Sequence, residues 1–204
     1  MSRLLLARHG ETELNSSFRY WGSTDAALSE LGLSQAECLR ERLSREKIDF
    51  IYSSFMRRAL VTAQIIASEH SLEIVACPEL REIDFGRAEG LTFDEISRSF
   101  PEVARMSLER DPALAYPGGE SLADMDKRVS QFRTRLEKHN TETTGLIVAH
   151  SGVLRTLICQ LLGIEPEQRW QIRLDLASLS IIETNHQGTM LNLLNDVSHL
   201  TKRS

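Results

Sequence analysis

The feature that most constrains the fold is an alternation of short apolar runs with segments of helical periodicity. Residues 4–7 and 145–149 are runs without a charged side chain, as is typical of strands buried on both faces. After the first run, leucines recur at helical spacing between residues 28 and 43, and Ser29 is placed to cap this predicted helix. A second predicted helix, stopped by Gly163, follows the other run. Alternating strands and helices predict an α/β fold with a mostly parallel sheet covered on both faces.

The remaining segments extend this pattern along the chain. No repeat, low-complexity stretch or long linker divides the sequence. We therefore predict a single three-layer α/β/α domain over residues 1–204, with a helical, lid-like insertion at about residues 91–120. Further strands are predicted at residues 48–52, 72–77, 177–184 and 190–194, the last two as a hairpin, and further helices at residues 59–66, 91–111 (broken at Pro101), 121–138 and 152–162.

The composition excludes several classes of protein. The 204 residues include 24 Lys and Arg against 29 Asp and Glu, a formal charge of −5, with no basic tract, so nucleic acid and anionic membranes are poor partners. No apolar run approaches the roughly 18 residues of a membrane span or the length of a signal peptide. Three separated cysteines indicate reduced thiols. We expect a cytoplasmic protein; its oligomeric state is open, with a homodimer as the commonest outcome.

Cationic and cationisable side chains follow three of the predicted strands. Arg8 and His9 come directly after the first strand, Arg57 and Arg58 follow the second, and His150 follows the later apolar run. Ligands of open α/β sheets bind outside the carboxyl ends of the strands, so these side chains should meet in one place. In an acidic protein such a cluster indicates an anionic ligand. The helix predicted after His150 adds backbone N–H groups that favour phosphate.

These residue types suit phosphoryl transfer that needs no metal. Arginine presents a permanently charged fork to phosphate oxygens, and a neutral imidazole can attack phosphorus to form a phosphohistidine. The leaving alkoxide needs a proton, and Glu82, in the loop at residues 80–86, offers a carboxyl group among apolar neighbours that favour its protonated form. The sequence has neither an H-E-x-x-H nor a C-x-x-C spacing, so we expect no metal and no other cofactor.

Five motifs stand in order along the chain. They are RHGETELN at residues 8–15, YSSFMRRA at 52–59, LREIDFGRAEG at 80–90, PGGES at 117–121 and VAHSG at 148–152. Together they resemble the motifs of the histidine phosphatase (phosphoglycerate mutase-like) superfamily. An isolated R-H-G would be weak evidence, but coincidence does not account for five ordered motifs. The resemblance implies the three-layer α/β/α fold of that superfamily.

The resemblance also implies a role for each matching residue. His9 becomes the nucleophile that is phosphorylated, and Glu82 the donor of a proton to the leaving group. The catalytic residues implied are His9, Glu82 and His150, and the residues implied to bind the substrate phosphate, together with His150, are Arg8, Asn15, Arg58 and the backbone of Ser151.

Within the family, the sequence favours a phosphatase over a mutase. Mutases of this family usually have a longer insertion with an Arg–Arg pair that grips the substrate, whereas residues 90–117 contain only the separate Arg98, Arg105 and Arg110. The motifs are most similar to those of α-ribazole phosphatases, which act in cobalamin assembly, and of broad-specificity phosphatases. We predict a phosphoric monoester hydrolase that acts through a phosphohistidine on a small phosphorylated metabolite, with α-ribazole phosphate as one candidate. A phosphoglycerate mutase and a non-catalytic phosphate-binding regulatory protein are the alternatives.

Overall fold

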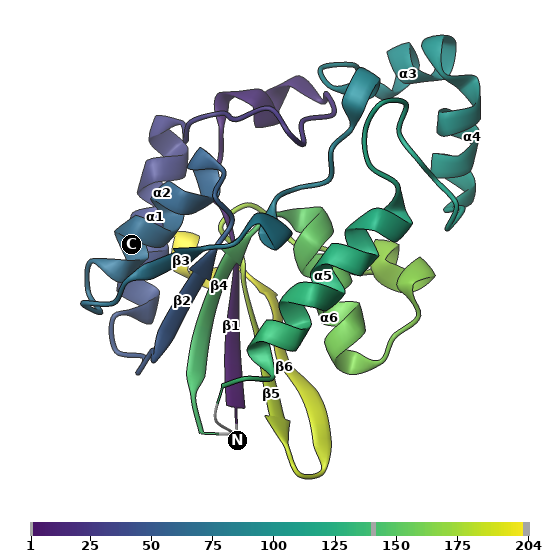
Figure 1. Cartoon of the computed structure of the whole chain (residues 1–204). Coiled ribbons are helices and arrows are strands. Elements are labelled where there is room, and N and C mark those ends of the chain that lie inside the picture. The colour runs from purple at the N-terminus through teal and green to yellow at the C-terminus, as the bar shows by residue number, and fades with distance from the viewer. Residues whose placement is uncertain (1, 140–141, 202–204) are drawn as a thin grey trace.

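A six-stranded sheet forms the middle layer of the molecule, and helices cover both of its faces (Figure 1). The computed structural model describes residues 2–139 and 142–201. The strand order is β3-β2-β4-β1-β5-β6, in which the first four strands are parallel and β5 and β6 form an antiparallel hairpin at one edge. The predicted α/β fold with a mostly parallel sheet is confirmed. The strands are β1 (Ser2–Arg8), β2 (Phe50–Ser53), β3 (Ile74–Ala76), β4 (Thr144–Ala149), β5 (Leu179–Asn185) and β6 (Gly188–Asp196).

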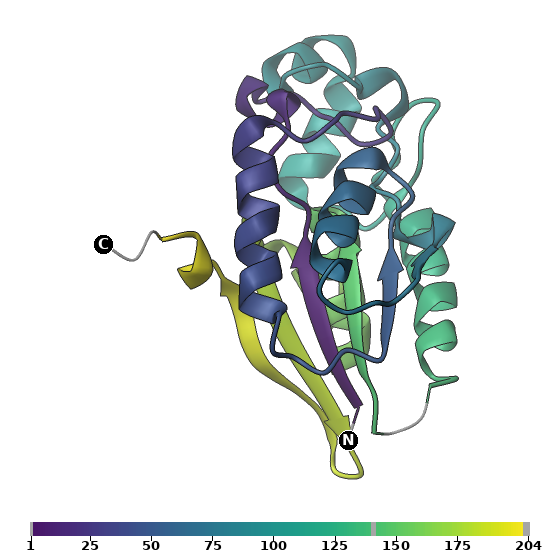
Figure 2. The same ribbon diagram turned by 90° about the vertical axis from the view of Figure 1, so that its left-hand side faces the viewer.

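The long helices lie in two layers. Helices α1 (Glu30–Leu43) and α2 (Arg57–Ala67) pack on one face of the sheet, and α5 (Leu122–Leu136) and α6 (Ser151–Leu162) pack on the other (Figures 1 and 2). Within the described residues, no helix is both long enough and apolar enough to cross a membrane. The cytoplasmic location and the homodimer stay predictions.

Both helix ends that the sequence marks are confirmed. The Oγ atom of Ser29 accepts a hydrogen bond from the backbone N–H of Gly32 and so caps α1. Gly163 ends α6 with φ of 66°, in the left-handed region that glycine adopts without steric cost.

Strand β1 shows why a wholly apolar run marks a central strand. It pairs with β4 on one side and with β5 on the other. Successive side chains point to opposite faces, so Leu5 and Ala7 join the core under α1 and α2, while Leu4 and Leu6 join the core under α5 and α6. Each buried leucine contributes roughly 1.5–3 kcal/mol to stability, so β1 is held firmly from both sides.

The register of the central strands places the ends of β1, β2 and β4 side by side. Arg8 lies opposite Ala149, and Ser53 lies opposite Val148. Parallel strands of matched register end at the same edge of the sheet, so the residue that follows each strand leaves the sheet beside the others. This edge, at the top of the sheet in Figure 1, is where the predicted site residues gather.

Two short helices stand beyond this edge of the sheet. Helices α3 (Phe93–Ser99) and α4 (Pro101–Glu109) lie past the carboxyl ends of the strands in both views (Figures 1 and 2). They divide the predicted helical stretch at Pro101, because proline begins a helix more readily than it continues one. That this segment acts as a lid stays a prediction.

Candidate active site

The two histidines meet where β1 and β4 end. The ring centroids of His9 and His150 are 5.1 Å apart, and the ring planes are inclined at 59°. His9 is 4% exposed, and His150 is completely buried. The backbone N–H of His9 donates to the carbonyl oxygen of Ala149, so the pairing of β1 with β4 is what brings the two rings together.

Hydrogen bonding determines which nitrogen of His9 holds the proton. Its Nδ1 lies 2.7 Å from the carbonyl oxygen of Gly10, and because a carbonyl only accepts, Nδ1 donates and Nε2 keeps its lone pair. Burial, together with the charges of Arg8 and Arg58, holds the pKa of His9 well below its ordinary value. The ring is therefore neutral near pH 7 with an unprotonated Nε2, which is the state that a nucleophilic imidazole requires.

His150 holds its proton on the other ring nitrogen. Nε of Arg58 donates to Nδ1 of His150 over 3.2 Å, and because a guanidinium has no acceptor, the His150 proton is on Nε2. That Nε2 lies 2.9 Å from Oγ of Ser54 and donates to it. Burial, followed by the neighbouring His9 and Arg58, lowers the pKa of His150 well below its ordinary value. His150 is therefore a neutral hydrogen-bond donor beside His9.

Of the two arginines that open α2, Arg58 is the one at the site. Arg58 is 4% exposed, whereas Arg57 is exposed to solvent. Nη1 of Arg58 donates to the carbonyl oxygen of Thr24 over 2.7 Å, and Nη2 donates to that of Gly22 over 2.8 Å. Burial lowers the pKa of Arg58. The guanidinium thus orients both His150 and the loop that follows β1.

That loop packs tightly against the acid loop, residues 80–86. A Cβ atom at position 22 would lie 1.8 Å from the carbonyl oxygen of Ile83, so glycine is required there. Glu89 also holds the loop, because its Oε1 accepts hydrogen bonds from the backbone N–H groups of Gly22 and Ser23. The segment after β1 and the predicted proton donor are therefore fixed relative to each other.

Arg8 is the second cation beside the rings. Its Nη1 donates to the carbonyl oxygen of Leu174 over 2.7 Å, while its Nε is buried and has no hydrogen-bond partner among the described residues. Protein surrounds most of the side chain, and this burial lowers the pKa of Arg8 to about 10. A desolvated guanidinium with an unused N–H is unfavourable until an anion binds, so Arg8 favours an anionic ligand.

The predicted proton donor lies at the start of α6. Oε2 of Glu82 accepts a hydrogen bond from the backbone N–H of Gly152 over 3.1 Å, and Oε1 accepts one from Ile83 over 3.0 Å. A Cβ atom at position 152 would come within 2.6 Å of Oε1, so glycine leaves room for the carboxylate. Because Gly152 is two residues beyond His150, the carboxylate stands beside the histidine pair.

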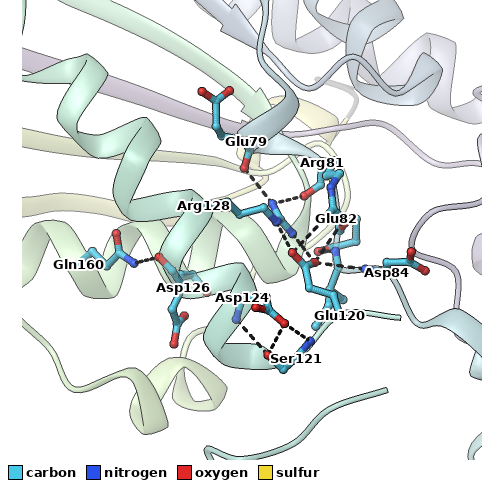
Figure 3. Close-up of polar contacts among 12 residues, drawn as sticks. Glu79, Arg81, Glu82, Asp84, Glu120, Ser121, Asp124, Asp126, Arg128 and Gln160 are labelled. Carbon is cyan, nitrogen blue, oxygen red and sulfur yellow. Dashed lines mark hydrogen bonds and ion pairs between the residues drawn. The ribbon is translucent and has the colours of Figure 1, made fainter. Parts of the chain in front are cut away.

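A buried ion network holds the acid loop against α5 (Figure 3). Glu120, which is 6% exposed, accepts hydrogen bonds from Nε and Nη2 of Arg128 at 2.7 and 2.9 Å and from Nη2 of Arg81 at 3.0 Å. Nη1 of Arg128 donates in turn to the carbonyl oxygens of Glu79 and Arg81, at 2.8 and 2.7 Å. The chain just before Glu82 is therefore tied to one helix through two arginines.

Asn15 and Ser151 line two different hollows, Asn15 together with Arg8 and Ser151 together with Glu82. Oδ1 of Asn15 accepts hydrogen bonds from the backbone N–H and the Oγ1 of Thr12, at 2.8 and 2.9 Å. Because Oδ1 can only accept, a hydrogen bond from Asn15 to phosphate has to come from Nδ2. Ser151 is the first residue of α6, where backbone N–H groups have no partner within the helix, and it lines the same cavity as Glu82.

A cavity of about 220 Å³ opens beside Glu82 and reaches Ser107 of α4. The edge of the Phe85 ring meets two other rings of the lining, at centroid distances of 5.0 Å to Tyr20 and 4.8 Å to Tyr116. Trp170 and Arg155 also line the cavity.

The arrangement can bind a tetrahedral anion and transfer it. Two neutral imidazoles, the guanidinium groups of Arg8 and Arg58 and the carboxylate of Glu82 lie within electrostatic reach of one another at the sheet edge. Within residues 2–139 and 142–201, no three His, Cys, Asp or Glu side chains are grouped so as to hold a metal ion. The structure brings together His9, His150, Arg8, Arg58 and Glu82, with Asn15 and Ser151 at the border; it adds Ser54, Glu120 and Arg128, for which the sequence predicts no role.

The amino-acid sequence matches a known protein family over almost its whole length. Residues 4–197 match the family described as histidine phosphatase superfamily (branch 1). Phosphoserine phosphatase 1 of Hydrogenobacter thermophilus is 36% identical over 200 residues, which cover 98% of this chain and 95% of that protein.

Solved structures share the fold over nearly the whole chain. The α-ribazole phosphatase from Shigella flexneri superposes with a TM-score of 0.88 at 31% identity, covering 95% of this chain and 96% of that one. A phosphoserine phosphatase mutant from Entamoeba histolytica, solved in complex with phosphoserine, superposes with a TM-score of 0.86 at 31% identity, covering 98% of this chain and 100% of that one. The chain therefore belongs to the histidine phosphatase superfamily, branch 1, and is a phosphatase enzyme.

Proposed function

We propose that this phosphatase is a metal-independent phosphomonoesterase that acts through a phosphohistidine at His9. The observation that supports the proposal most is the state of the His9 ring, which is neutral, protonated on Nδ1 and unprotonated at Nε2. Two largely buried guanidinium groups lie near it and favour a phosphate dianion. An unprotonated imidazole nitrogen next to bound phosphate is what formation of an N–P bond requires.

In the first step, Nε2 of His9 attacks phosphorus and the ester P–O bond breaks. The electron pair of that bond goes to the leaving oxygen, which takes a proton from the carboxyl group of Glu82. The Nδ1 proton stays on the His9 ring, bound to the carbonyl oxygen of Gly10. Arg8 and Arg58 stabilise the charge that spreads over the phosphoryl oxygens, which is usually the largest contribution to catalysis. His150 contributes when its Nε2–H turns from Oγ of Ser54 to a phosphoryl oxygen.

In the second step, water replaces the leaving group. Glu82, now a carboxylate, accepts a proton from the water as its oxygen forms a bond to phosphorus. The N–P bond breaks, its electron pair returns to Nε2 of His9, and inorganic phosphate leaves. The enzyme is then back in its starting state, with Glu82 protonated.

We propose a small phosphorylated metabolite as the substrate. Phosphoserine and α-ribazole phosphate are the first candidates, because similar proteins are named for phosphatase activities of these two kinds. Hydrolysis is favoured over the mutase reaction because Arg98, Arg105 and Arg110 are exposed, and Arg105 is paired with Glu102 of its own helix. Incubation with phosphoglycerates, followed by analysis for transfer rather than release, tests the mutase alternative.

A phosphate-release assay on p-nitrophenyl phosphate with EDTA present tests the proposal. We expect turnover to persist in EDTA and to fall by at least about 10³-fold in His9→Ala, because the nucleophile is gone. His186→Ala is the control, since His186 is exposed. A labelled phosphoryl group should remain on the protein after an alkaline quench and be lost in acid, as a phosphohistidine is. Near-normal turnover by His9→Ala, or inactivation by EDTA, would refute the mechanism.

A further inference from the structure

Arg155 is a cation of the cavity that the reaction at His9 does not use. It lies on α6, four residues after Ser151, and lines the cavity together with Glu82. Its Nε is buried without a hydrogen-bond partner among the described residues, and no ion pair there joins its guanidinium to a carboxylate. Glu82 and Asp175 attract it only from a distance. The side chain is therefore partly buried, and its Nε is shielded from water without being paired.

The other arginine of the cavity lining has its donors occupied. Nε of Arg169 donates to the carbonyl oxygen of Pro166 over 2.6 Å, Nη1 donates to Oγ1 of Thr156 over 3.0 Å, and Nη2 donates to the Asp126 carboxylate over 2.7 Å. Desolvating a guanidinium is costly unless an anion compensates the charge. Of these two cations, Arg155 is the one that a bound anion would satisfy.

The position of Glu82 identifies which part of a substrate the cavity receives. A proton donor has to reach the ester oxygen that departs, so the leaving group extends past Glu82. The cavity begins at Glu82 and contains Arg155 in its wall. Arg8 and Arg58 lie beside the histidine pair, where they can bind the phosphoryl group. Arg155 therefore stands where the leaving group lies.

The volume of the cavity sets how much of a leaving group it can enclose. At about 220 Å³ it equals about seven water volumes of roughly 30 Å³ each, which is room for roughly seven non-hydrogen atoms. The rings of Tyr20, Phe85 and Tyr116 cover apolar atoms of such a group. A carboxylate matches the remaining guanidinium, because its two oxygens accept two parallel N–H bonds from an arginine.

We propose that Arg155 binds a carboxylate on the leaving alcohol, so that the substrate is the phosphate monoester of a small hydroxy acid. The inference rests on the proposed phosphatase function and names the class of substrate for that same site. Arg155 in this role sets specificity, since it contacts the leaving group and takes no part in breaking the P–O bond.

The test compares phosphate esters with and without a carboxylate. Phosphoserine and phosphoethanolamine form one pair, and 3-phosphoglycerate and glycerol 3-phosphate form a second. We expect the wild type to favour the carboxylate-bearing member by about 10- to 100-fold in kcat/KM. Arg155→Met, which keeps an apolar stem, should remove that preference, and its loss of kcat/KM should be at least about tenfold larger on the carboxylate-bearing esters than on p-nitrophenyl phosphate.

Matched variants and a binding assay separate specificity from folding and turnover. Arg155→Lys should restore part of the preference because it keeps the charge but not the fork. Arg45→Met is the control, since Arg45 is exposed and outside the cavity lining. Calorimetric dissociation constants for the same ester pairs, measured in His9→Ala with and without the Arg155 change, give the preference without turnover.

Each outcome decides the role of Arg155. Equal losses on all substrates would assign Arg155 to the phosphoryl group or to folding, and an unchanged preference would place the carboxylate elsewhere; both results overturn the inference. A wild type that shows no carboxylate preference overturns it as well. If the wild type fails to hydrolyse p-nitrophenyl phosphate, the proposed function fails, while the binding preference in His9→Ala still decides what Arg155 recognises.

Discussion

The two halves of the site are built in different ways. The phosphate-binding half contains His9, His150 and Arg8, which end or follow paired parallel strands, so the register of the sheet sets their positions. The leaving-group half is the cavity lined by Tyr20, Tyr116 and Trp170, which come from loops and short helices distant in the chain. The sheet thus positions the groups of the chemistry, whereas the packing of loops shapes the space for the rest of the substrate.

This division predicts two kinds of mutational effect. A change in the phosphate-binding half should affect every phosphate ester, because the phosphoryl group is common to all of them. A change on the side of Glu82 and the cavity should have an effect that depends on the leaving group. The substitutions below test whether the halves are as separate as the structure indicates.

Arg58→Met should have the largest effect. The variant loses a permanent charge near the phosphoryl group and the N–H that sets the proton position on His150, so we expect kcat/KM to fall about 10³-fold for alkyl and aryl phosphates alike. Steady-state kinetics on phosphoserine and p-nitrophenyl phosphate measure this. Arg57→Met is the control because Arg57 is exposed. A loss confined to one type of leaving group would contradict the division.

Glu82→Gln should affect alkyl phosphates more than aryl phosphates. An alkoxide needs a proton to depart, whereas p-nitrophenolate leaves readily without one. We therefore expect kcat/KM to fall about 10²-fold for alkyl phosphates and less than about tenfold for aryl phosphates. The ratio of kcat/KM values for the two substrate types is the measurement, and Glu41→Gln on the exposed face of α1 is the control. Equal losses on both substrates would argue against Glu82 as the proton donor.

Glu120→Gln should lower both stability and the use of alkyl phosphates. The change leaves Arg81 and Arg128 without their buried carboxylate, which should reduce the free energy of unfolding by about 3 kcal/mol. A looser acid loop should also cost about tenfold in alkyl phosphate hydrolysis, with less loss on aryl phosphates. Urea titrations and the alkyl-to-aryl ratio test the two parts, with Glu102→Gln as the exposed control. An unchanged ratio would mean that the network supports only the fold.

Acidification should produce the smallest effect, through the buried histidines. Their pKa values are well below normal in the folded state, whereas the unfolded chain has histidine pKa values of about 6.5. Below pH 6.5 the unfolded chain takes up protons that the folded site does not, so the free energy of unfolding should fall by up to about 1.4 kcal/mol per pH unit for each histidine. Above that pH this contribution is absent. Urea titrations at about pH 7.5 and 5.5 measure the slope. His9→Asn should make the slope shallower, and an unchanged slope would mean that His9 titrates normally in the fold.

Most of the fold follows from patterns that are local in the chain. The apolar runs at residues 4–7 and 145–149 predict the two adjacent central strands, and the cap at Ser29 predicts the start of α1. Strand β3 is less well predicted, since it spans three residues rather than residues 72–77. It lies at the edge of the sheet, where only one neighbouring strand extends the pairing.

The residues of the site also differ in how well the sequence predicts them. The histidines and Arg8 are predictable because they follow apolar strands, and the same rule would have singled out Ser54 directly after β2. The sequence indicates Arg155 less clearly, only through its position one helical turn after Ser151. The sequence does not indicate Arg128, because its spacing on α5 does not reveal that its partner is Glu120.

By itself, the sequence determined the α/β architecture, the edge of the sheet where cations meet, and the family whose motifs they form. Only the tertiary structure decided which nitrogen of each histidine is protonated and which of the two adjacent arginines is buried. It also decided that Nε of Arg155 has no hydrogen-bond partner within the described part of the chain. The physical reason is the distance along the chain over which each property is determined. Periodicity and strand ends are properties of neighbouring residues, whereas protonation and pairing depend on desolvation and on donors that distant segments bring into contact.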